Sequence, residues 1–330
     1  MSEDADYSRS SWVPDHDFSS ARRAYDSHVG RSYNDAVDTG KTIKDLVPES
    51  ITTEARNPLL IQVDGTGSMG SRTSVIVSKW PYLEHEAKQY LGDDTEISLA
   101  SIGDANSTGG SQEDYPLVIR PFAMGKDLEK RAKELVFEGK GGSQTCETYE
   151  LGALYWLHNC HMPNAVNPIG IILGDENSYD RINHSIARKY ARVALQDNID
   201  SSEVYSHLKK KMALYFIQLA YSSTSFNDPT SQEVHKGWAK LLGEDHVVQL
   251  QDPDRVVDVI YGILAKEMGK IPYFCAEIEE RQRPDQVKTV YEALKTVHVD
   301  KGGKLLSSGN STMHKSLGGK RGTRLLPPGK

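Results

Sequence analysis

The stretch Leu59–Ser71 constrains the fold more than any other part of the chain. It opens with Leu59–Val63, an apolar run that is typical of a buried strand, and glycines interrupt the sequence directly afterwards. Asp64, Thr66 and Ser68 alternate with these glycines, which let the backbone turn tightly. The pattern therefore predicts a buried strand whose carboxyl end presents one carboxylate and two hydroxyls.

Oxygen ligands of this kind suit Mg²⁺, Mn²⁺ or Ca²⁺ rather than zinc. A phosphate-binding loop is the main alternative, because glycine-rich turns after strands also hold phosphates. The Gly-Lys-Ser/Thr ending of such a loop does not follow Asp64. A plain Gly/Ser turn without any ligand is the second alternative.

The rest of the chain alternates between strands and helices. The further strands are predicted at 95–102, 115–122 (at an edge), 169–174, 213–220 and 245–250. The helices are predicted at 74–91 (kinked or delayed by Pro81), 126–137, 149–159, 181–196, 201–212, 234–242 and 255–268. This alternation favours an α/β fold with a mostly parallel sheet and helices on both faces.

Acidic residues recur where the predicted strands end. Asp104 follows the strand at 95–102, and Asp175 and Glu176 follow the strand at 169–174. A glycine-rich loop delivers Thr145 and Thr148 just before a helix. Each acid alone is explained by helix capping. Because ligands of open α/β sheets bind outside the carboxyl ends of the strands, the set together predicts one cation site.

The order Asp-x-Thr-x-Ser, then a Gly-Gly loop with Thr, then an apolar strand closing in Asp, resembles the metal-ion-dependent adhesion site of von Willebrand factor A (VWA) domains. The resemblance covers residues 55–270, and the phrases around Asp64, Asp104 and Thr148 are similar to bacterial and phage-encoded proteins of this family. It implies a Rossmann-like VWA fold.

The resemblance also implies the ligands of a divalent cation. Thr66 and Ser68 would bind through their hydroxyls, and Asp64 and Asp175 would bind directly or through water. The loop ligand is either Thr145, which follows the Gly-Gly pair, or Thr148, whose spacing from the next helix is better and which we favour slightly. Thr66 replaces the usual Ser and keeps the hydroxyl. Asp104 and Glu176 are candidates for groups that support the ligands.

Three functional hypotheses follow. The first is a non-enzymatic protein-protein interaction module that binds Mg²⁺ (or Mn²⁺ or Ca²⁺) and, through it, an acidic side chain of a partner; an AAA+ ATPase is one partner that the resemblance suggests. The second is a structural assembly protein, phage-encoded or bacterial, in which the metal only braces the loops. The third is a metal-dependent hydrolase, which we rank last because no separate general base or nucleophile is evident.

Charge and composition describe the remaining segments. Residues 300–330 carry seven Lys and Arg against one Asp, a net charge of +6. Because the whole chain has a net charge of −7, residues 1–299 have a net charge of −13. We expect an N-terminal arm at 1–54, the VWA-like domain at 55–270, a helical extension at 271–299 and a flexible basic tail at 300–330. Three cysteines, the absence of a long apolar run and an acidic N-terminus favour a cytoplasmic protein without a membrane segment.

Two further clusters are interpreted as structural. His158, Cys160 and His161 lie close together, but no second Cys/His pair follows at a spacing suitable for zinc. The run Lys209–Lys211 is interpreted as a solvated helix end, since the body is acidic and no aromatic motif accompanies it. We therefore do not expect nucleic-acid binding.

Overall fold

The computed structural model describes residues 46–106, 116–137, 145–223 and 225–299. The predicted basic tail, most of the predicted N-terminal arm and part of the glycine-rich loop before Thr145 lie outside these residues.

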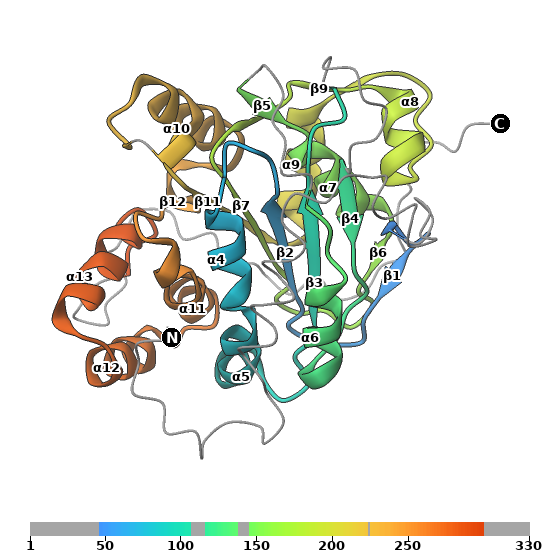
Figure 1. Cartoon of the computed structure of the whole chain (residues 1–330). Helices are drawn as coiled ribbons and strands as arrows, with labels where there is room; N and C mark the ends of the chain where they lie inside the picture. The colour runs from blue at the N-terminus through green and yellow to red at the C-terminus, as the bar shows by residue number, and fades with distance from the viewer. Residues whose placement is uncertain (1–45, 107–115, 138–144, 224, 300–330) are drawn as a thin grey trace.

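A six-stranded sheet forms the centre of the molecule (Figure 1). Its strands in spatial order are β12 (Val247–Gln249), β11 (Ala213–Gln218), β7 (Ile169–Gly174), β2 (Leu59–Asp64), β3 (Ile97–Ile102) and β4 (Leu117–Ile119). All neighbours pair in parallel except β4, which pairs antiparallel with β3 at the edge. The prediction of a mostly parallel α/β sheet is thus confirmed, including the edge position of the strand predicted at 115–122.

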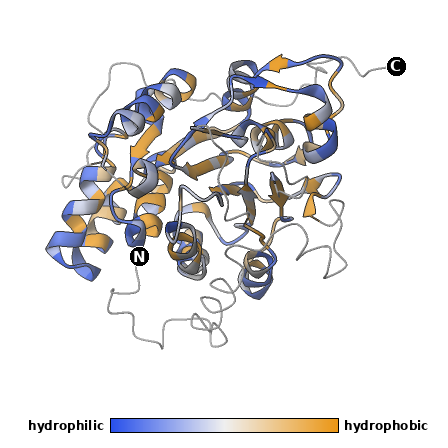
Figure 2. Ribbon diagram, turned by 45° about the horizontal axis from the view of Figure 1, so that its top comes forward, coloured by the Kyte–Doolittle hydropathy of each residue, from blue (hydrophilic) through white to orange (hydrophobic). Residues whose placement is uncertain are grey.

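Helices cover both faces of this sheet (Figure 1). The longer helices are α4 (Arg72–Ser78), α5 (Trp80–Leu91), α6 (Gly125–Lys133), α7 (Tyr149–His158), α9 (Ser201–Lys211), α10 (Pro229–Leu242) and α11 (Val256–Glu267). α4 and α11 both pack against α5 on one side, and α9 packs against both α7 and α10 on the other. Every residue of β2, β3 and β7 is buried, and Figure 2 shows the apolar residues concentrated on the strands and on the inner sides of the helices.

Short elements connect these layers. The two-residue strands are β1 (Ile51–Thr52), β5 (Cys146–Glu147), β6 (Cys160–His161), β8 (Asn177–Ser178), β9 (Arg181–Ile182) and β10 (Ile199–Asp200). The short helical turns are α8 (His184–Ile186), η2 (Ala187–Ala191), η3 (Tyr221–Ser223), η4 (Glu244–His246) and η5 (Pro253–Arg255).

Two helices occupy the stretch predicted to be a helical extension. They are α12 (Ile271–Arg281) and α13 (Pro284–Ala293), and both pack against α11. Ile278 and Leu294 are fully buried and belong to the same apolar core as the sheet. This extension is therefore continuous with the body of the protein.

The helix predicted at 181–196 is confirmed only over its middle part, residues 184–191, and its two ends are wrong. Arg181 and Ile182 instead form β9, which pairs antiparallel with β10. Asn183 then caps a helical segment that ends at Ala191, because Arg192 adopts a left-handed conformation with φ of 56°. The helix predicted at 74–91 is in fact two helices, and Pro81 lies in the first turn of the second, where its missing N–H costs nothing.

The interpretation of Lys209–Lys211 as a solvated helix end is wrong for two of its three members. The Lys209 ammonium donates to the carbonyls of Leu241 and Leu242 at the end of α10. The Lys211 ammonium donates to three carbonyls, at Trp156, Leu157 and Cys160, where α7 ends. Both lysines therefore satisfy orphan carbonyls of neighbouring helices.

In the described part of the chain, no helix combines the length and the apolar character needed to cross a membrane.

Candidate functional site

The carboxylate of Asp64 lies fully buried at the end of β2. Its Oδ1 accepts hydrogen bonds from the backbone N–H of Thr66 at 2.8 Å and from the Thr66 hydroxyl at 2.7 Å. Its Oδ2 accepts a hydrogen bond from the hydroxyl of Tyr149, the first residue of α7. Three donors from two segments thus fix the orientation of this carboxylate.

Asp175 meets the same turn from the neighbouring strand. It follows β7, which pairs with β2, so both strands deliver their last residues to the same edge of the sheet. The Ser68 hydroxyl donates to Asp175 Oδ1 at 2.8 Å and lies 3.3 Å from the Thr66 hydroxyl. Four of the predicted ligands, Asp64, Thr66, Ser68 and Asp175, therefore form one continuous hydrogen-bonded chain.

Arg72 is a member of this cluster that the sequence analysis missed. Its guanidinium Nη2 lies 2.6 Å from Asp175 Oδ2 and also donates to the carbonyl of Ser68 at 2.8 Å. The same Asp175 oxygen accepts the backbone N–H of Ser222, just after β11, at 3.1 Å. Nothing in the sequence distinguishes Arg72 from an ordinary exposed residue in the first turn of a helix.

The structure separates the two candidate loop ligands. Thr148 is fully buried, and its hydroxyl donates to the carbonyl of Gly103, after β3, at 2.6 Å. Thr145 is exposed, and its backbone carbonyl accepts the N–H of Asn177 at 3.2 Å. Thr148 directly precedes Tyr149, whose hydroxyl reaches Asp64, so Thr148 lies one residue from a side chain of the cluster.

Asp104 occupies the exit of β3, as predicted. Its Oδ1 accepts the N–H of Asn106 at 2.8 Å, and its Oδ2 accepts the Tyr179 hydroxyl at 3.2 Å. These contacts tie Asp104 to its own turn and to the segment after β8.

Buried carboxyls surround the cluster and shift one another's protonation. Burial, and then the charge of Asp175, raises the pKa of Asp64 to about 7. Burial, followed by the charges of Asp64 and Asp175, raises the pKa of Glu176 to about 8. Burial raises the pKa of Glu147 above its usual range, with Asp64 and Glu176 adding to the effect. Burial also raises the pKa of Glu150 to about 8. Burial thus favours the protonated form of these carboxyls.

The charges at this edge are strongly unbalanced. The carboxylate of Asp175 forms an ion pair with Arg72. Among the described residues, no Lys, Arg or His forms an ion pair with the other four carboxyls, Asp64, Glu147, Glu150 and Glu176. One oxygen of Glu147 and one of Glu176 are buried without a hydrogen-bond partner in the described part of the chain. Sequence analysis predicted neither the burial of Glu147 and Glu150 nor this imbalance, since Glu residues near a helix start usually face solvent.

Within the described ranges, no group of three or more His, Cys, Asp and Glu side chains is placed to hold a metal ion by itself. A cation at the edge of the sheet would therefore depend on the hydroxyls of Thr66, Ser68 and Thr148 in addition to the carboxylates. Such mixed hydroxyl and carboxylate sites suit hard cations, which accept neutral oxygen ligands and water.

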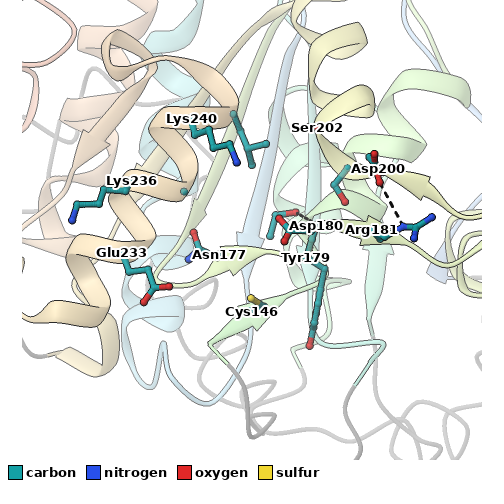
Figure 3. Close-up of a pocket in the computed structure, with 14 residues that line it drawn as sticks. Cys146, Asn177, Tyr179, Asp180, Arg181, Asp200, Ser202, Glu233, Lys236 and Lys240 are labelled. Carbon is teal, nitrogen blue, oxygen red and sulfur yellow. Dashed lines mark hydrogen bonds and ion pairs between the residues drawn. The ribbon is translucent and has the colours of Figure 1, made fainter.

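A separate pocket of about 860 Å³ opens between α10 and the start of α9 (Figure 3). Its charged lining residues are three acids and three bases, Asp180, Asp200, Glu233, Arg181, Lys236 and Lys240. Figure 3 shows Lys240 reaching toward the start of α9 and Lys236 pointing away from it. None of the predicted ligands lines this pocket, and its balanced charges select no particular ligand.

Comparison with known proteins gives no family for this chain. No protein-family model matches it, and no curated protein matches it. Two crystal structures of the pilus adhesin SpaC from Lactobacillus rhamnosus GG are similar in part. They share 12% and 10% identity with the chain, with TM-scores of 0.44 and 0.47, and the second is an open conformation. Each match covers 66% of this chain and 31% of SpaC, so the chain spans about a third of the adhesin's length.

Proposed function

We propose that this protein is a non-enzymatic interaction module of the VWA type, which binds a divalent cation and, through it, an acidic side chain of a partner protein. The observation that carries the proposal is the hydrogen-bonded chain of Asp64, Thr66, Ser68 and Asp175 at the adjacent exits of β2 and β7. The meeting of the carboxyl ends of these parallel strands at this point supports it further.

The residues at the edge fit Mg²⁺, Mn²⁺ or Ca²⁺ by their chemistry. Asp64 and Asp175 supply carboxylate oxygens, while Thr66, Ser68 and Thr148 supply neutral hydroxyls, and hard divalent cations prefer such oxygen ligands. The partnerless oxygens of Glu147 and Glu176 add buried negative charge that only a cation or a proton can compensate. A bound cation would supply a positive charge that attracts a partner carboxylate.

The remaining residues orient these ligands. Tyr149 and Thr66 hold the two oxygens of Asp64 in place, so this carboxylate needs little reorganisation on binding. Ser68 and Arg72 do the same for the two oxygens of Asp175. Because three of the five proposed ligands are neutral, much of the cation's charge remains available to the partner's acid.

Titration with Mn²⁺ followed by electron paramagnetic resonance tests the cation site, because the signal of free Mn²⁺ reports binding directly. We expect saturable binding to the wild-type protein and competition by Mg²⁺. Asp64→Asn, which keeps the shape of the side chain, should abolish binding while the protein remains folded by circular dichroism. Unchanged binding in Asp64→Asn would refute the proposal.

The same assay assigns the loop ligand. Thr148→Val removes one hydroxyl with little change in volume, and Thr148→Ser keeps it, so we expect loss of affinity in the first variant and retention in the second. Thr145→Val is the matched control on the exposed residue and should bind Mn²⁺ as the wild type does. The reverse result would make Thr145 the ligand.

Capture of a partner tests the interaction itself. Immobilised protein should retain a partner from its native lysate in Mg²⁺ and release it in EDTA, and Asp64→Asn should retain none. A partner that remains bound to both the EDTA-treated protein and Asp64→Asn would show that the cation does not bridge the two proteins.

A further inference from the structure

Arg72 connects three segments that surround the proposed cation site. Its Nε donates to the carbonyl of Met69 at 3.0 Å, and its Nη2 donates to the carbonyl of Ser68 at 2.8 Å, so it closes the turn after β2. Its Nη1 donates to the carbonyl of Ala220, after β11. Its Nη2 also pairs with Asp175 Oδ2 at 2.6 Å. A single guanidinium thus joins the exits of β2, β7 and β11.

The surroundings of Arg72 differ from those of a surface ion pair. The Arg72 side chain is 10% exposed and that of Asp175 is fully buried, so water screens their attraction only weakly. Each oxygen of Asp175 has a donor from the protein: Ser68 holds Oδ1, while Arg72 and the N–H of Ser222 share Oδ2. The protein itself therefore pairs and orients this carboxylate.

The backbone at Ser222 depends on the same carboxylate. Ser222 adopts a left-handed conformation with φ of 46° and ψ of 35°, which is uncommon for a residue other than glycine. Its N–H donates to Asp175 Oδ2, the oxygen that Arg72 also contacts. The N–H of Tyr221 donates to the hydroxyl of Ser231 in α10, so the segment 220–222, which contacts Arg72 and Asp175, is also tied to α10.

We propose that Arg72 is an internal counter-cation, a positioning residue that holds Asp175 and the exit of β11 in place in the cation-free protein and thereby keeps the affinity of the site for divalent cations low. This inference rests on the proposed function. Its physical basis is that two positive charges at one carboxylate repel each other. The guanidinium paired with Asp175 therefore reduces the binding free energy of a divalent cation at the same carboxylate.

The inference predicts an effect of opposite sign to that of a purely structural residue. If Arg72 only supported the loops, its removal would disorder Asp64, Ser68 and Asp175 and weaken cation binding. If Arg72 competes with the cation, removal of its charge must strengthen binding and, at the same time, destabilise the cation-free protein, because buried Asp175 loses its counter-charge. A gain in affinity combined with a loss of stability therefore identifies the competition.

The experiment compares Arg72→Gln and Arg72→Lys with the wild-type protein. Arg72→Gln removes the charge and keeps hydrogen-bond donors, while Arg72→Lys keeps the charge and loses the fork geometry. Mn²⁺ dissociation constants are measured by paramagnetic resonance, and the thermal stability of each protein is measured in EDTA. We expect Arg72→Gln to bind Mn²⁺ roughly tenfold more tightly than the wild type, and Arg72→Lys to remain near the wild type.

The outcomes separate this inference from the proposed function. Wild-type binding with equal or weaker binding in Arg72→Gln would overturn the counter-cation role and leave the cation site standing. No binding by any of the three proteins would overturn both. If Arg72→Gln does not fold, Arg72→Met, with a similar reach and no charge, replaces it. If neither variant folds without cation but both fold in Mn²⁺, the counter-cation role is supported. If neither variant folds in either condition, Arg72 is structural and the inference fails.

Discussion

Replacement of Glu150 by Gln tests whether the buried carboxyls at the edge of the sheet carry protons. The side chain of Glu150 is 1% exposed, and its Oε2 accepts the Ser178 hydroxyl at 2.9 Å and the N–H of Tyr179 at 3.3 Å. A glutamine oxygen accepts both bonds, so Glu150→Gln removes the titration and leaves the packing intact. Burial raises the pKa of Glu150 from 4.5 in the reference state to about 8.

The sign of the effect follows from proton binding. Between pH 4.5 and 8 the folded protein holds a proton on Glu150 that the unfolded chain has released, so the free energy of unfolding falls as the pH rises through this window. The slope for one group is about 1.4 kcal/mol per pH unit. Between pH 5.5 and 7.5 the wild type should therefore lose roughly 2–3 kcal/mol through this residue, and Glu150→Gln should not.

Urea unfolding in EDTA at several pH values between 5.5 and 8.5 measures this difference. Titrating groups remote from Glu150 contribute equally to both proteins, so the gap between the two curves reports Glu150 together with its effect on neighbours such as Asp104. Glu280→Gln, which changes an exposed carboxyl on α12, is the matched control for the loss of one negative charge. Parallel curves for Glu150→Gln and the wild type would mean that Glu150 is ionised in the fold, and the reasoning from burial would be wrong.

Two further changes test the packing at the two ends of α7, of which only the first end lies at the site. Lys211→Met removes an ammonium that donates to three carbonyls at the end of α7 and should lower the free energy of unfolding by about 1–3 kcal/mol, whereas Lys210→Met, on the exposed side of α9, should change it little. A Cβ on Gly174 would lie 1.9 Å from the Tyr149 hydroxyl, so Gly174→Ala should displace Tyr149 from Asp64 and destabilise the protein by about 1–3 kcal/mol in urea unfolding. Wild-type stability in either Lys211→Met or Gly174→Ala would contradict the contact that motivates it.

The sequence was sufficient to predict the sheet and most of its helices. Buried strands such as β2 and β7 are continuous apolar runs bounded by glycine or proline, and parallel strands end at one common edge of the sheet. Those two facts bring Asp64 and Asp175 together without any knowledge of the fold. The hydrogen bonds from Thr66 and Ser68 then follow, because both lie within one short turn after Asp64.

The features that the sequence did not predict depend on contacts between distant segments. Arg72 reaches an acid 103 positions later in the chain, and Lys211 reaches carbonyls more than 50 positions earlier. Helical periodicity alone gives both residues a solvent-facing position. The late start of the helix predicted at 181–196 has a similar cause, since the pairing of Ile182 with Ile199 overrides the helical pattern at its beginning. Local sequence patterns thus predict where strands end, while the partners of Arg72 and Lys211 depend on the tertiary structure.

The energetics of the sheet edge favour a binding role over a stabilising one. Six carboxyls there are at most 3% exposed: Asp64, Asp104, Glu147, Glu150, Asp175 and Glu176. Burial raises the pKa of Glu147 and Glu176, which means that burying their charged forms costs folding free energy. A core built for stability alone would hold apolar residues of similar volume instead. A ligand that binds the folded protein alone stabilises it by mass action, so a cation at Asp64 and Asp175 would offset this destabilisation. The proposed cation would then compete with protons at this edge, and its affinity should rise with pH near 7, because burial raises the pKa of Asp64 to about 7.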